Sequence, residues 1–270
     1  MKRVTDFARF RAEGNPISMV TCYDAWSARI LNEAPIDAVL VGDSVAMVMH
    51  GHPDTVHATV GMMATHTAAV RRGIGEKFVV TDIPFPEHRK GLTAAMEAVD
   101  AIMKAGANAV KIEGAQGHLD VVRHIVGSGV PVMGHLGLTP QSVHQMGGYR
   151  VQGRDSHAAH QIELDALALQ EAGVFALVLE CVPAELAARI TEALTIPTIG
   201  IGSGVHCGGQ ILVLQDVLGL NLGFKPKFLR TYADGADQFK AALGRFDEDI
   251  KAARYPSPEE SFLNEKISNH

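Results

Sequence analysis

Two ten-residue segments of the chain repeat one pattern, and this repeat limits the folds that the chain can adopt. Lys104–Glu113 and Glu171–Glu180 each pass from the end of a predicted helix through Ala-Gly and two connecting residues into a four-residue strand followed by glutamate. A looser third copy, Glu33–Gly42, ends one residue before Asp43. Glycine commonly ends a helix, and short connections to the next strand are usual. The repeat therefore predicts a fold built from βα units, either a barrel or a doubly wound parallel sheet.

Eight short apolar runs that end at turn or polar residues predict strands buried on both faces. They lie at residues 17–21, 38–41, 78–81, 109–112, 130–133, 176–179, 197–200 and 211–214. Helices are predicted between many of them, at residues 24–33, 60–72, 93–104, 160–171 and 184–193. Eight alternating units in 270 residues favour a closed (β/α)₈ barrel, which needs about 250 residues, although the pattern alone also allows an open sheet.

The domain organisation is predicted to be simple, because no linker or change of composition divides the chain. We expect one α/β domain over residues 1–270, a TIM-type (β/α)₈ barrel with an extra N-terminal helix. Residues 1–15 are predicted to form that helix, which could plug one end of the barrel. Residues 16–230 are expected to form the barrel core, and residues 231–270 a C-terminal helix and tail.

Composition excludes several classes of protein. A hydrophobic content of 47% argues against disorder, and a net charge of -6 gives no basic patch for nucleic acid or anionic membranes. Three widely spaced cysteines without a CxxC pair argue against a disulfide framework or a zinc site. The N-terminus lacks the apolar core of a signal peptide, and no apolar run approaches the ~20 residues of a membrane span. We therefore expect a cytoplasmic protein that binds neither nucleic acid nor membranes.

Charged residues follow five of the predicted strands. In a barrel the carboxyl ends of all strands share one face, which is the face that carries active sites. Lys111 points to the same side of its strand as the residue two positions later. Carboxylates that lie close together repel unless a cation is present, and oxygen ligands suit a hard divalent cation such as Mg²⁺. A divalent metal is therefore predicted at this face. The residues at these strand ends are Asp43, Asp82, Glu113, His135 and Glu180.

Each of these residues also has a structural alternative. An aspartate at a strand end can cap the next helix, Asp82 can anchor a turn, and His135 can be a histidine of the core. Lys111 is harder to explain in this way, because a lysine in a buried strand needs a partner to stay charged. A functional role is favoured over these structural alternatives, because a (β/α)₈ barrel places all of these residues on the face that carries active sites.

Three further segments have open interpretations. Gly200–Gly204 fits either a phosphate-binding loop or a tight turn. Residues 137–157 are too long for a plain connection and are predicted to form a mobile cover over the site. The histidines of one stretch lack a metal-ligand spacing and are interpreted as loop and helix surface; they are His50, His52, His57 and His66.

Seven ordered motifs resemble those of one enzyme family. They are Leu40–Ser44, His66–Gly73, Ala105–Gly114, Gly134–Ser142, Gly147–Arg154, Leu179–Pro183 and Ile199–Gly202. Together with the tail that ends at Phe262, they resemble ketopantoate hydroxymethyltransferase (3-methyl-2-oxobutanoate hydroxymethyltransferase) over residues 16–262. The chain departs from the family's usual residues at positions that do not include those assigned to the metal or the base; they are Ala46, His57, Ser203 and Gly208.

The resemblance implies a barrel that binds Mg²⁺ and makes 2-dehydropantoate, for pantothenate synthesis, from 3-methyl-2-oxobutanoate and the co-substrate 5,10-methylenetetrahydrofolate. It implies that Asp43 and Asp82 bind the metal and that Glu113 completes the metal's shell. It also implies a homo-oligomer, typically a decamer. The substrate-binding residues it implies are Asp43, Ser44, Asp82, Lys111 and His135, and the proton acceptor is Glu180.

The expected chemistry agrees with those roles. A metal chelated by the two oxygens of a 2-oxo acid stabilises the enolate that forms when the C3 proton leaves. Lys111 adds positive charge beside the same oxygens. The enolate then attacks the one-carbon unit of the folate.

Two other hypotheses are considered. One is a Mg²⁺-dependent lyase or mutase of the phosphoenolpyruvate mutase and isocitrate lyase type, which also works on 2-oxo-acid enolates. Such enzymes usually place a cysteine in a mobile-loop signature, a context that Cys22, Cys181 and Cys207 lack. The other is a non-catalytic binding barrel, which would not need a base such as Glu180.

Overall fold

Eight parallel strands form a closed barrel in which each strand pairs with its neighbours in sequence and β1 pairs with β8. The computed structural model describes residues 2–223 and 225–262. The strands are β1 (Ile17–Thr21), β2 (Ala38–Val41), β3 (Phe78–Asp82), β4 (Ala109–Glu113), β5 (Val132–Gly137), β6 (Ala176–Glu180), β7 (Thr198–Ile201) and β8 (Gly209–Leu212). The predicted (β/α)₈ barrel is confirmed, and the open sheet is excluded.

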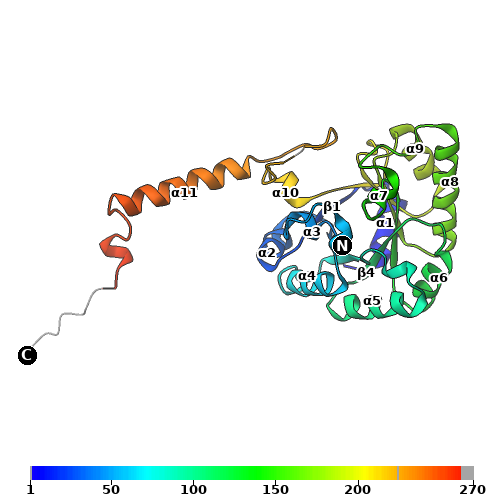
Figure 1. Ribbon diagram of the computed structural model, residues 1–270, viewed down its shortest axis with the longest axis horizontal. Helices are drawn as coiled ribbons and strands as arrows, with labels where there is room; N and C mark the ends of the chain where they lie inside the picture. Colours follow the sequence, from blue (N-terminus) through cyan, green and yellow to red (C-terminus); the bar gives the residue numbers. More distant parts are fainter. Residues whose placement is uncertain (1, 224, 263–270) are drawn as a thin grey trace, which may run out of the picture. The chain divides into compact units, whose positions relative to one another are not determined.

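Six helices follow one another around the barrel in chain order (Figure 1). They are α2 (Ala25–Glu33), α4 (Val60–Gly73), α5 (Leu92–Lys104), α6 (Leu119–Gly127), α8 (Ser156–Glu171) and α9 (Ala184–Ala193). Short helices interrupt the connections that follow β2, β3 and β5: α3 (Val45–Val48), η1 (Thr55–His57), η2 (Glu87–Arg89), η3 (Pro140–Ser142) and α7 (Val143–Met146).

Two predicted strands were placed two residues away from their observed starts. β5 begins at Val132 and runs through Gly134, where a Cβ atom would lie 3.0 Å from Leu177. β8 begins at Gly209, where a Cβ atom would lie 2.5 Å from the carbonyl oxygen of Ile17. These glycines serve close packing between neighbouring strands, whereas the sequence pattern placed them in loops.

Helix boundaries follow local hydrogen bonds. α8 begins at Ser156, four residues before its predicted start, because the carboxylate of Asp155 accepts a hydrogen bond from the backbone N–H of Ala158 at 2.9 Å. No helix was predicted where α6 lies. Asp24 and Thr59 cap α2 and α4 in the same way as Asp155 caps α8.

The predicted N-terminal helix closes the barrel at the end where the strands begin. It is α1 (Val4–Glu13), and its Phe7 is completely buried in the same core cluster as Ile17 and Phe78, the first residues of β1 and β3. The Phe7 ring packs edge to face against Phe78 and Phe175, with centroids 5.3 Å and 5.0 Å apart. The expected plug is therefore confirmed.

The chain divides into two compact units, Met1–Leu214 and Gln215–His270. The barrel lies in the first unit. α10 (Leu214–Val217) begins at its last residue, and the second unit contains α11 (Gly235–Lys251) and η4 (Pro258–Glu260). The predicted C-terminal helix is thus found, while a single domain over residues 1–270 stays a prediction.

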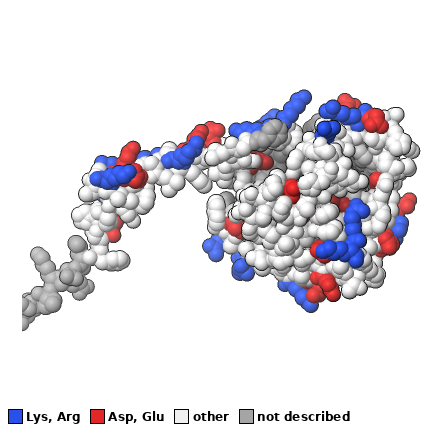
Figure 2. All heavy atoms as spheres, in the orientation of Figure 1, with Lys and Arg blue, Asp and Glu red and all other residues white. Residues whose placement is uncertain are grey.

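The surface carries charges of both signs. Figure 2 shows lysine and arginine side chains interspersed with aspartate and glutamate on the barrel face in view. Within the described part of the chain, no helix is both long and apolar enough to cross a membrane.

His88 is a buried histidine of η2, in the connection that follows β3. Its ring packs against that of His118 with centroids 4.6 Å apart, and neither of its ring nitrogens has a hydrogen-bond partner among the described residues. Burial lowers the pKa of His88 to about 3, and the nearby His118 and Arg89 act in the same direction. His88 is therefore neutral in the folded protein at physiological pH.

This burial predicts loss of stability in acid. The unfolded chain binds a proton at His88 below about pH 6.5 and the folded chain does not, so stability falls as the pH drops from 6.5 toward 3. At pH 5 the cost is about 2 kcal/mol. We expect the loss of unfolding free energy between pH 7.5 and pH 5, measured by urea denaturation, to be smaller by that amount in His88→Phe than in the wild type. An equal loss in both proteins would contradict this account.

Candidate active site

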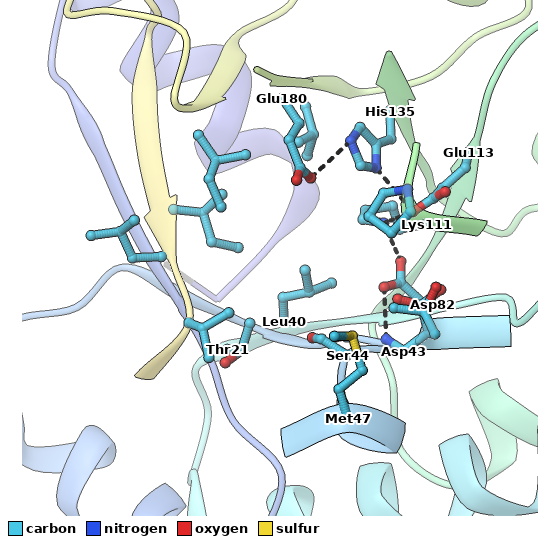
Figure 3. A pocket seen from close by; sticks show the side chains of 18 of the residues that line it. Thr21, Leu40, Asp43, Ser44, Met47, Asp82, Lys111, Glu113, His135 and Glu180 are labelled. Carbon is cyan, nitrogen blue, oxygen red and sulfur yellow. Dashed lines mark hydrogen bonds and ion pairs between the residues drawn. The ribbon is translucent and has the colours of Figure 1, made fainter. Parts of the chain in front are cut away.

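The carboxyl ends of the strands surround a cavity that contains every residue predicted for the site. Figure 3 shows Glu180, His135, Lys111, Glu113 and Asp82 along one wall, with Leu40 across from them. Five of the charged residues are at most 4% exposed. The predicted site residues that line the cavity are Asp43, Ser44, Asp82, Lys111, Glu113, His135 and Glu180.

Strand register brings these side chains together. Asp82 of β3 pairs with Lys111 of β4, and Glu113 of β4 pairs with His135 of β5. Residues two apart on a strand point to the same side, which turns both Lys111 and Glu113 into the cavity. The placement of Lys111 beside Glu113, predicted from their spacing, is confirmed by a contact of 3.7 Å between Nζ and Oε1.

Lys111 neutralises part of the buried negative charge. Its Nζ lies 2.5 Å from Oδ1 of Asp82. Burial acts to lower the pKa of Lys111, but the surrounding carboxylates of Asp82, Glu113 and Asp43 outweigh it and raise that pKa. Lys111 is therefore a cation held among acids, and it does not need a surface position to stay charged.

His135 links two carboxylates. Its Nδ1 lies 3.3 Å from Oε1 of Glu113 and its Nε2 lies 3.4 Å from Oε2 of Glu180. Burial and Lys111 act to lower the pKa of His135, but the two carboxylates raise it to about 9. His135 is not a core histidine packed among apolar groups. It separates Glu180 from the other acids of the site.

Among the described residues, Asp43 is the acid of the site that forms no ion pair within 4 Å. Its backbone N–H donates to Oδ2 of Asp82 at 3.0 Å, and its own Oδ2 accepts a hydrogen bond from Nε2 of Gln141 at 2.8 Å. Burial raises the pKa of Asp43 well above its usual range, and the charges of Asp82 and Glu113 raise it further. Asp43 therefore has the strongest electrostatic need for an added cation.

Three residues of the site were not predicted from the sequence. Gln141 contacts Asp43, and the hydroxyl of Tyr23 lies 2.8 Å from Oγ of Ser44. Tyr149, from the segment predicted to cover the site, lines the cavity. Two sequence features could have identified these residues. Gln141 and Tyr149 lie in motifs that carry the family resemblance, and Tyr23 follows the end of β1.

Most of the remaining cavity wall is apolar. It is formed by side chains from both halves of the barrel, among them Leu40 of β2, Val178 of β6 and Ile201 of β7. An apolar wall opposite a charged wall suits a small molecule with an ionic head and a branched hydrocarbon body.

The other predicted segments have structural roles. Ser203 in the loop after β7 donates a hydrogen bond to the carbonyl oxygen of Leu179 at 2.7 Å, which favours the tight-turn alternative for that loop. His50 and His57 are exposed, as predicted, whereas His52 and His66 are half-buried. Nε2 of His50 lies 2.9 Å from Nε2 of His66. The cover contains η3 and α7. Its mobility stays a prediction.

The oxygen donors fit a hard divalent cation. Mg²⁺ usually binds one or two carboxylates directly and keeps several waters. Over residues 2–223 and 225–262, no three His, Cys, Asp or Glu side chains form a ready set of metal ligands. A cation held by fewer protein ligands, beside Asp43, agrees with both observations.

Comparison with known proteins identifies the family. The family model described as ketopantoate hydroxymethyltransferase matches residues 1–258. The chain belongs to the ketopantoate hydroxymethyltransferase family. The 3-methyl-2-oxobutanoate hydroxymethyltransferase of Bdellovibrio bacteriovorus is 58% identical over 262 residues, which are 97% of this chain and 100% of that protein. The enzyme of the same name from Coxiella burnetii is 53% identical over 93% of this chain and 95% of its own.

Solved structures of other enzymes share the fold of this ketopantoate hydroxymethyltransferase family member. A 2,3-dimethylmalate lyase of the PEP mutase/isocitrate lyase superfamily superposes with a TM-score of 0.58 at 15% identity, covering 99% of this chain and 92% of that one. A phosphonopyruvate hydrolase gives 0.59 at 11% identity, covering 96% and 93%. At these identities the likeness concerns the barrel alone, so the family match favours the transferase over the lyase or mutase hypothesis.

Proposed function

We propose that this chain transfers a hydroxymethyl group from 5,10-methylenetetrahydrofolate to 3-methyl-2-oxobutanoate to give 2-dehydropantoate. The observation that carries the proposal is the separation of Glu180 from the acids around Lys111 by His135, within one cavity. One side can hold the ionic head of a 2-oxo acid, while the other presents a base to its carbon chain.

The ionic head would bind at the charged wall. Asp43 and Asp82 would bind a divalent cation such as Mg²⁺, and Glu113 would complete the shell around it. When bound, that cation withdraws electrons from the oxygens of a 2-oxo acid and makes its C3 proton more acidic. Lys111 and the hydroxyl of Ser44 would contact the substrate carboxylate, and Tyr23 would orient that hydroxyl through the bond of 2.8 Å.

Glu180 would act as the base. The branched end of 3-methyl-2-oxobutanoate would lie against the apolar wall that includes Leu40 and Val178, with C3 toward Glu180. Glu180 accepts the C3 proton. The methylene carbon of the folate loses its bonds to both nitrogens, N5 and N10, and gains one bond to C3 and one to the oxygen of a water molecule. The proton taken from C3 and one proton of that water go to the two nitrogens, so the products are 2-dehydropantoate and tetrahydrofolate.

Deuterium exchange tests the first half of this reaction. In D₂O, with Mg²⁺ and without folate, the protein is expected to exchange the C3 proton of 3-methyl-2-oxobutanoate, as followed by NMR. A chelator such as EDTA should stop the exchange. Absence of exchange with Mg²⁺ present would overturn the proposed proton abstraction.

We also propose that the chain forms a homo-oligomer, as the family resemblance implies. α11 supports this, because its Phe239, Leu243, Phe246 and Ile250 are exposed and recur at helical spacing. An exposed apolar stripe of this kind is typical of a contact surface between protein chains.

A further inference from the structure

We propose that Gln141 is a positioning residue that holds the carboxylates of Asp43 and Glu113 in the orientation a divalent cation needs. The inference rests on the proposed function, because it concerns the cation of that site. Gln141 does not line the cavity, so its role would be exerted through the acids that do.

The contacts of Gln141 converge on the acids of the site. Its Nε2 donates to Oδ2 of Asp43 at 2.8 Å and to the carbonyl oxygen of Ile83 at 2.9 Å. Its backbone N–H donates to Oε2 of Glu113 at 3.0 Å. Because both hydrogens of the side-chain amide are used, the network also fixes which end of the amide is nitrogen.

Through these contacts Gln141 links the carboxyl ends of four neighbouring strands. Asp43 follows β2, Ile83 follows β3, Glu113 ends β4 and Gln141 follows β5. Gln141 is 4% exposed, so water competes poorly for these bonds. The strand ends that carry the acids are therefore held in a fixed relation by one side chain and one backbone amide.

The orientation of Asp43 depends on this amide in particular. Asp82 is fixed by Lys111 and Glu113 is contacted by His135, whereas the carboxylate of Asp43 has Gln141 as its one side-chain partner among the described residues. The bond occupies Oδ2 and leaves Oδ1 for a ligand. A neutral donor also fixes the carboxylate without cancelling its charge, which a lysine in the same place would do.

Removal of the donor is expected to weaken cation binding without removing a ligand. Gln141→Met keeps the size of the side chain and loses both N–H groups. Loss of a hydrogen bond that orients a metal ligand typically lowers affinity about 10–100-fold. We expect the dissociation constant for Mn²⁺, measured without substrate by electron paramagnetic resonance of the free ion, to rise by that factor.

The controls separate positioning from damage to the fold. Gln145→Met alters an exposed glutamine four residues later and should leave Mn²⁺ affinity unchanged. In Gln141→Met, saturating Mn²⁺ should restore most of the deuterium-exchange rate, a recovery that general disruption would not permit. Gln141→Asn, one methylene shorter, provides a second variant if Gln141→Met does not fold.

Two results would overturn the inference. One is a folded Gln141→Met or Gln141→Asn protein that binds Mn²⁺ within twofold of the wild type. The other is an affinity loss of the same size in Gln145→Met. If instead the wild type binds no Mn²⁺ and exchanges no deuterium, the proposed function itself fails, and that outcome is distinguishable from failure of Gln141 alone.

Discussion

Glu180→Gln is expected to lower turnover on the order of 10³-fold, the usual contribution of a general base. The amide keeps the size of the side chain and can still contact Nε2 of His135, which lies 3.4 Å from Oε2 of Glu180 in the wild type. It has no basic oxygen to accept the C3 proton. Deuterium exchange and formation of 2-dehydropantoate should fall together, while binding of 3-methyl-2-oxobutanoate, measured by calorimetry, stays close to the wild type.

Glu171→Gln is the matched control for this variant. Glu171 occupies the start of the same repeat unit and is exposed at the end of α8, so its replacement should leave exchange unchanged. A fully active Glu180→Gln protein would show that the base is another residue.

Lys111→Met is expected to have the largest effect on stability. It leaves the buried carboxylates of Asp82 and Glu113 without their contacts at 2.5 Å and 3.7 Å. Removal of one partner from a buried ion pair costs about 3–5 kcal/mol, because the remaining charge is unpaired. Chemical denaturation of Lys111→Met and the wild type at pH 8 measures this difference.

The pH dependence of Lys111→Met identifies the cause of that loss. Burial already raises the pKa of Asp82 and Asp43 in the wild type, and loss of Lys111 should raise both pKa values further. Acids with a raised folded-state pKa bind protons more tightly in the folded protein, so stability relative to the wild type should recover as the pH falls from 8 to 5. Lys104→Met, at an exposed lysine, should show neither effect. A loss that does not change with pH would indicate a packing defect instead.

The barrel fold and the charged residues of the site could be predicted from the sequence, but the bounds of some strands could not. Repeated βα units and apolar runs reveal the strands because both depend on local pattern. Charged residues directly after such runs reveal Asp43, Asp82 and Glu113, since the barrel gathers strand ends on one face. The bounds of β5 and β8 were wrong because Gly134 and Gly209 are required by packing against other strands, which no local pattern records.

Gln141 escaped prediction for a different reason. A neutral amide after a strand has no charge to attract attention, and its partners Asp43 and Glu113 lie 98 and 28 residues away in the chain. The pairing of His135 with both Glu113 and Glu180 likewise depends on register between neighbouring strands. Individual residues were predictable, whereas the contacts that give them distinct electrostatic roles required the folded barrel.

The most direct test of the proposed activity is an assay with both substrates. Purified protein with Mg²⁺, 3-methyl-2-oxobutanoate and 5,10-methylenetetrahydrofolate should form 2-dehydropantoate and tetrahydrofolate in equal amounts, as measured by mass spectrometry. Omission of either substrate or addition of EDTA should abolish product formation. A folded protein that binds the divalent cation and still forms no 2-dehydropantoate under these conditions would contradict the proposed function.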